Sequence, residues 1–185
     1  MSEMKSAWEI AQEKANRLGK LSAEEKEQQE RQKYRQIGQA LAQKWLDSPR
    51  RPNIIEELNK YEEKERAVIR QAAIEHLADV IELTTTEGIN STKKVIVAIS
   101  SLRPELLPTT EEISHLVQEY NDAEQKVRQE LESTCRETLH KLRISGTAID
   151  AINIEVDPEW QPAHEKLVEA FTPMLNDLKR ALISR

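Results

Sequence analysis

The sequence is poor in the residues on which most catalytic motifs depend. It has four glycines and contains neither a GxGxxG nor a GxxxxGKS/T string, so it lacks the phosphate-binding loops of the common nucleotide folds. Its single cysteine, Cys135, excludes an intramolecular disulfide and favours a reduced compartment. No serine lies in a GxSxG string. We therefore expect a protein that is not an enzyme and that has no cofactor.

Aromatic residues and long apolar runs are also scarce. Aromatic residues make up 4% of the chain, so any core must consist mainly of Leu, Ile, Val and Ala. No run of 18 apolar residues is present, which excludes an apolar membrane-spanning helix. Residues 1–19 are charged throughout and lack the apolar region of a signal peptide. We expect a soluble, cytoplasmic protein without membrane contact.

Charge is distributed unevenly along the chain. Residues 1–51 contain 11 Lys and Arg against 8 Asp and Glu, whereas residues 52–185 contain 16 against 25. Contacts with phosphates need concentrated positive charge. The acidic body therefore argues against a nucleic-acid partner, and we expect a protein partner instead.

Two apolar stripes, in residues 54–80 and 113–142, dominate the sequence. The stripe residues are Ile54, Leu58, Tyr61, Ile69, Ala73, Leu77 and Val80, then Ile113, Leu116, Tyr120, Ala123, Val127, Leu131, Cys135, Thr138 and Leu142. Their spacing is close to the 3.6-residue period of an amphipathic α-helix, with Glu65 filling one gap in the first stripe. The pattern predicts an all-α fold, an elongated bundle with two long antiparallel helices. Because the stripes are thin, other helices or a second copy of the chain must complete the core.

We divide the chain into three parts. Residues 1–21 are predicted to form a docking helix, residues 22–51 a charged helix with an apolar C-terminal half, and residues 52–185 the body of the bundle. Residues 24–33 contain no apolar side chain, so their order is left open. The docking helix has a narrow apolar seam, which needs a close partner surface. The seam consists of Met4, Trp8, Ala11, Ala15 and Leu18.

Two short apolar segments and one proline complicate the helical pattern. Residues 95–99 are β-branched and fit a short buried helix or a strand, of which we favour the helix. Apolar and polar residues alternate in 152–156, which is typical of a strand. A minor two-stranded β patch, 95–99 with 152–156, is therefore one alternative. Pro173 predicts a kink or a break within a last helix at 159–184.

Two ExxH strings, at residues 112–115 and 137–140, are the closest approach to a metal-ligand motif. A carboxylate and an imidazole three residues apart on a helix occur in di-iron bundles. Both strings lie on one predicted helix and start 25 residues apart, about 37 Å. They cannot share one site, so we predict no metal site and keep a metal-binding helical bundle as the weakest alternative.

The candidate partner-binding residues lie near helix ends or in the strand-like segment. They are Trp8, Leu18, Trp45, Ile152, Ile154, Trp160 and His164. Tryptophan is enriched in the hot spots of protein interfaces. The leading prediction is a non-enzymatic helical scaffold, adaptor or assembly subunit that makes protein–protein contacts, alone or as a homodimer.

Residues 143–165 resemble the end of the GrpE nucleotide-exchange co-chaperones. That family has a long helix followed by a small β domain with a Phe-Asp-Pro-x-x-His-Glu string. Here the long predicted helix is followed by Arg143-Ile-Ser-Gly146, by residues 151–156, by Asp157-Pro158 and, after five intervening residues, by His164-Glu165. The resemblance implies an ATPase-regulating co-chaperone that contacts its partner through residues 144–165, which is the alternative function.

Overall fold

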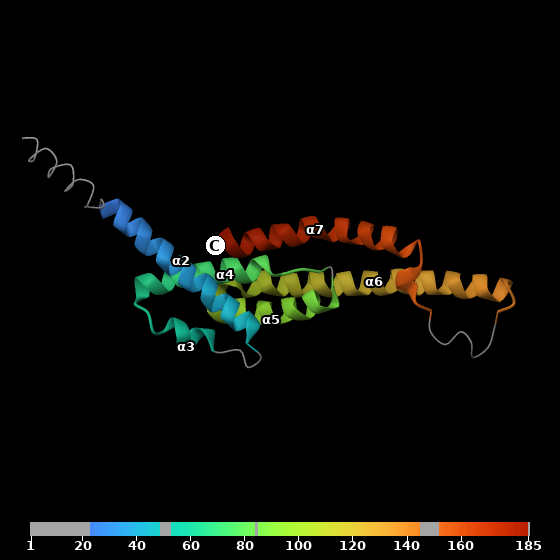
Figure 1. The fold of residues 1–185 in the computed structure, drawn as a ribbon, viewed down its shortest axis with the longest axis horizontal. Helices are drawn as coiled ribbons and strands as arrows, with labels where there is room; N and C mark the ends of the chain where they lie inside the picture. Colours follow the sequence, from blue (N-terminus) through green and yellow to red (C-terminus); the bar gives the residue numbers. More distant parts are fainter. Residues whose placement is uncertain (1–22, 49–52, 84, 145–151, 185) are drawn as a thin grey trace, which may run out of the picture. The chain divides into compact units, whose positions relative to one another are not determined.

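The structure is a computed structural model (Figure 1), which describes residues 23–48, 53–83, 85–144 and 152–184. Over these ranges the protein contains helices and no strand, so the predicted all-α fold is confirmed. The elements are α2 (Ala23–Asp47), α3 (Ile54–Leu58), α4 (Glu63–Asp79), α5 (Thr86–Leu102), the 3₁₀ turn η1 (Pro104–Leu106), α6 (Leu107–Lys141), the 3₁₀ turn η2 (Ile154–Val156) and α7 (Trp160–Ser184). The chain divides into two compact units, residues 1–73 and 74–185, and the boundary falls within α4.

In the first unit, α2 and the first part of α4 are packed closely at Gly38. A Cβ atom at Gly38 would lie 2.3 Å from the carbonyl oxygen of Ile69 and 2.8 Å from the Cβ of Ala72. The helix backbones can therefore approach this closely only because position 38 has no side chain. Trp45, one of the candidate partner-binding residues, is buried on the same helix.

The first apolar stripe does not form one helix, contrary to the sequence prediction. α3 ends at Leu58 and α4 begins at Glu63. The Glu65 carboxylate accepts a hydrogen bond of 3.1 Å from the backbone N–H of Glu62. This is the return bond of a capping box, which opens a new helix. Glu65, the gap in the stripe, thus caps the start of α4.

Glu65 also links the start of α4 to α2. The Tyr34 hydroxyl donates a hydrogen bond to the Glu65 carboxylate. This bond, supported by the Glu62 N–H, lowers the pKa of Glu65, and the same bond raises the pKa of Tyr34 to about 12. N-terminal to Tyr34, residues 24–33 are helical and exposed, which answers the question of their order.

In the second unit α6 packs against α5 and α7 (Figure 1). The predicted long helix over 113–142 is confirmed by α6. Contacts pair residue 135 with 157, 128 with 160 and 120 with 164, so α7 runs antiparallel to α6. The fully buried side chains include Ile74, Leu77, Ile81, Val95, Ile99, Leu106, Ile113, Val117, Tyr120 and Leu182. Beyond Tyr120, no α6 side chain is fully buried, so the core ends before the midpoint of this helix.

The alternative of a two-stranded β patch is not present in the residues that the structure describes. Residues 95–99 lie inside α5, as the favoured alternative had it, with Val95 and Ile99 buried four residues apart. In the second segment, the Asn153 side chain accepts a hydrogen bond of 3.1 Å from the N–H of Glu155. Short polar side chains that bind the nearby backbone compete with strand pairing. The segment therefore forms the 3₁₀ turn η2.

The end of the chain is also helical. α7 continues through Pro173 without a break. The Thr172 hydroxyl donates to the Val168 carbonyl at 2.7 Å, so Thr172 does not act as a new N-cap. Residues 152–184 consist of η2, a short link and α7, so they do not form the β domain that the co-chaperone resemblance implies.

Candidate functional site

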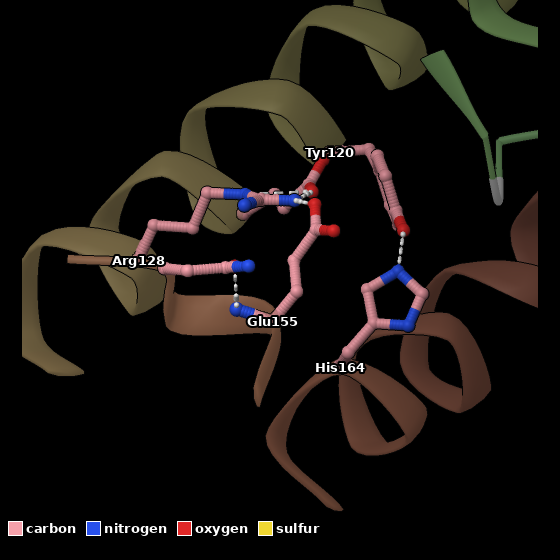
Figure 2. Close-up of polar contacts among 6 residues, drawn as sticks. Tyr120, Arg128, Glu155 and His164 are labelled. Carbon is pink, nitrogen blue, oxygen red and sulfur yellow. Dashed lines mark hydrogen bonds and ion pairs between the residues drawn. The ribbon is translucent and has the colours of Figure 1, made fainter. Parts of the chain in front are cut away.

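A buried tyrosine and a histidine join the middle of α6 to the first turns of α7 (Figure 2). The Tyr120 hydroxyl and Nε2 of His164 form a hydrogen bond of 3.1 Å. The Phe171 ring packs edge-on against Tyr120, with 5.5 Å between ring centroids. Burial, followed by the charge of Glu124, raises the pKa of Tyr120 to about 12, so the hydroxyl is protonated at neutral pH.

Arg128 connects three elements beside this pair. Its guanidinium carbon lies 4.2 Å from the centroid of the Trp160 ring, in a cation–π arrangement. One guanidinium nitrogen donates to Glu124 at 3.0 Å and to Glu155 at 3.4 Å (Figure 2). The Trp160 ring also stacks on His164, with 5.2 Å between centroids. Arg128 on α6 is thereby linked to η2 and to α7.

The cluster around Tyr120 and Arg128 joins three elements of the second unit. Tyr120 is fully buried, and its hydroxyl is paired with His164. Arg128 is engaged by two carboxylates and an indole ring. Their combined effect is to hold η2 and the first turn of α7 against α6. This fixes one wall of the groove described next.

A groove lies between the C-terminal half of α6 and the segment 152–159. Its volume is about 730 Å³. Its apolar lining consists of Leu131, Leu139, Ile144, Ile152, Val156 and Pro158. Val156 is 76% exposed and Ile144 44% exposed. Large apolar side chains that are both exposed and gathered around a concave surface mark a site of interaction.

The end of α6 shapes the second wall of this groove. Arg143 has a left-handed backbone, with φ of 57°. The N–H of Arg143 donates to the His140 carbonyl, and the N–H of Ile144 donates to the Leu139 carbonyl, each at 3.0 Å. This pair of bonds is the Schellman motif, in which the residue after the left-handed one contacts the last turn of the helix. It places Ile144 next to Leu139 in the groove.

Cys135 and Asp157 form the polar contact within the groove. The Cys135 thiol donates to an Asp157 carboxylate oxygen at 3.0 Å, and the other oxygen accepts from the Glu159 N–H at 2.8 Å. These bonds lower the pKa of Asp157. The hydrogen bond to Asp157, with burial and the negative charge of Asp157 and Glu159, raises the pKa of Cys135. Since the thiolate is the nucleophilic form, this thiol is a poor nucleophile.

The structure brings together four of the seven predicted partner-binding residues. Ile152 lines the groove, while Ile154, Trp160 and His164 lie in the segment that carries its wall. Ile154 and Trp160 are buried, so they support the site from behind. Trp45 belongs to the first unit. Trp8 and Leu18 lie outside the described residues.

Three residues that define the site were not selected from the sequence, namely Val156, Tyr120 and Arg128. A strand would place Ile152, Ile154 and Val156 on one face, but a 3₁₀ turn rotates successive residues by about 120°. Ile154 is therefore buried while Val156 is exposed. Tyr120 was recognised only as a stripe residue, and Arg128 had no signal, because its ring partner is 32 residues away.

The sequence predicts no metal site and no membrane-spanning helix. All four residues of the ExxH strings are exposed on α6. Among the described residues, no group of three or more His, Cys, Asp or Glu side chains is arranged to hold a metal ion. No helix in the described part of the chain has the length and hydropathy needed to cross a bilayer.

The fold and the groove define an all-α protein with an apolar groove beside the end of its longest helix. A family model matches residues 55–183, which include the whole groove, and the chain belongs to that family. Its description is a family of unknown function, DUF6657. Comparison with the curated proteins and with the solved structures gave no match.

Proposed function

We propose that the protein is a non-enzymatic scaffold or adaptor that binds a helical segment of a protein partner in the groove. The observation that carries the proposal is the exposure of Val156 and Ile144 around an apolar concave surface. Leaving such side chains in water is unfavourable, by about 25 cal/mol per Å² of apolar area. A partner that covers them recovers this free energy.

The shape and charge of the groove favour one kind of occupant. From Leu131 to Leu139 the α6 wall is about 12 Å long, which is about two turns of a docked helix. Grooves of this kind bind the apolar face of an amphipathic helix. The charged lining residues, Asp157 and Glu159, are both acidic. The preferred partner is therefore an amphipathic helix with Lys or Arg beside its apolar face.

The proposal is tested by changing an exposed groove residue and an equally exposed residue elsewhere. Val156→Glu adds a charge to the groove, whereas Val97→Glu adds the same charge to a valine on α5 that is 65% exposed. Both changes are at the surface and should alter stability by less than about 0.5 kcal/mol. Val156→Glu should weaken partner binding about tenfold or more, as expected for an interface hot spot.

The measurement is capture with cross-linking and mass spectrometry from the native cell. Wild type and Val97→Glu should capture the same proteins, with cross-links near residues 131–139. Val156→Glu should lose those proteins and keep the circular dichroism of the wild type. Retention of the same partners by Val156→Glu would refute the groove as the contact surface.

A further inference from the structure

We infer that the occupant of the groove is the N-terminal seam, residues 4–18, of a second copy of the chain. The inference rests on the proposed function of the groove as a helix-binding site. It makes the protein a self-assembling scaffold, in which one copy supplies the docked helix and another supplies the groove. The seam residues lie outside the described residues, so their part of the argument is drawn from the sequence.

The dimensions of seam and groove match. Trp8 and Ala15, with Ala11 between them, are seven residues apart, about 10.5 Å along a helix. The ends of the α6 wall, Leu131 and Leu139, are eight residues apart, about 12 Å. Alanine at two of three positions lets a helix approach closely, and one tryptophan supplies a large apolar side chain for the concave surface.

The charges are complementary as well. Lys5 and Lys14 flank the seam on a helical projection, and the charged groove lining consists of Asp157 and Glu159. The same asymmetry holds for the whole chain, since residues 1–51 have an excess of positive charge and residues 52–185 an excess of negative charge. Complementary charge of this kind directs association and suppresses wrong partners.

The structure of α2 favours a groove on a second copy of the chain over the groove of the copy that carries the seam. Residues 24–33 are helical, polar and exposed, and they extend for about 15 Å before α2 reaches its packed part. This part of α2 therefore offers the seam no apolar surface on its own helix. This arrangement suits contact with another molecule.

The single native cysteine provides the test, because Cys135 lines the groove. In the full-length protein, Ala11→Cys puts a second thiol on the seam, and Ser6→Cys puts one on the opposite face of the predicted helix. A mild added oxidant such as diamide takes up the two protons and two electrons released when a disulfide forms. The reaction is run at alkaline pH, because the pKa of Cys135 is raised.

The expected product of Ala11→Cys is a covalent dimer in which mass spectrometry finds the peptide of position 11 joined to the peptide of Cys135. Ser6→Cys should yield much less of the corresponding peptide. In the absence of oxidant, Trp8→Glu should lower the average mass measured by analytical ultracentrifugation relative to wild type. A joined peptide found only within monomers would place the seam in its own groove and overturn the inference.

Absence of the joined peptide from Ala11→Cys would also overturn the inference. That failure is distinct from failure of the proposed function. If Val156→Glu still loses captured proteins while Ala11→Cys forms no link to Cys135, the groove binds other proteins and the self-assembly inference alone is wrong. If Val156→Glu loses nothing and the link does not form, both are wrong.

Discussion

Gly38→Ala is the change whose effect is most sharply determined by the close packing of α2 on α4. In a solvent-exposed helix, this substitution stabilises by about 1 kcal/mol, because alanine has the higher helix propensity. At Gly38 the added Cβ would lie 2.3 Å from the carbonyl oxygen of Ile69. That atom belongs to the backbone, so no side-chain rotation can relieve the overlap.

The magnitude follows from how far the helices must separate. An acceptable contact between a carbon and an oxygen is about 3.3 Å, so α2 has to move by about 1 Å at this point. The movement loosens the packing of Leu41, Ala42 and Trp45, which are buried on the same helix. Overpacking of this kind costs about 1–3 kcal/mol. We expect a net loss of stability of about 1–2 kcal/mol after the gain in propensity.

Urea unfolding followed by circular dichroism measures this loss. The matched control is Gln39→Ala, an exposed position on the same helix, which should change stability by less than about 0.5 kcal/mol. The sign of the change in the urea midpoint of Gly38→Ala tests the reasoning. If Gly38→Ala raises the urea midpoint, α2 and α4 are not packed at this distance and the reasoning is refuted.

Two further predictions concern the polar contacts. Arg128→Ala should destabilise the second unit by about 1 kcal/mol, since it removes a cation–π contact with Trp160 and ion pairs that are partly exposed. It should also speed amide exchange at the start of α7. Arg128→Lys should have a smaller effect on both the stability and the exchange rate. The folded-state pKa of Glu65 is lowered, so its bond from Tyr34 stabilises at neutral pH and is lost as the pH falls below about 4.3. Tyr34→Phe should therefore lower the urea midpoint at pH 7 and differ less from wild type in acid; an equal difference at both pH values would exclude this linkage.

Local patterns account for the parts of the fold that were predicted correctly. The 3.6-residue spacing over 113–142 was sufficient to predict α6, because an amphipathic face determines a helix without knowledge of its partner. The same reasoning failed for 54–80. There, α3 ends at Leu58, and side-chain periodicity carried no information on the capping bond between Glu65 and Glu62 that begins α4.

The candidate site was predicted only in its approximate position. Ile152, Ile154, Trp160 and His164 were selected because their segment departs from the helical pattern, and they lie in one region of the structure. Their roles were not predictable. Which side chain of a 3₁₀ turn faces solvent depends on the surface against which the turn packs, and that surface is supplied by α6.

The sequence by itself determined the all-α class and the long helix, since each follows from interactions between residues near one another in the chain. Only the tertiary structure decided where the groove lies. Its walls are brought together by the hydrogen bond between Tyr120 and His164 and by the stacking of Arg128 on Trp160. These partners are 44 and 32 residues apart, and no local pattern specifies such pairs.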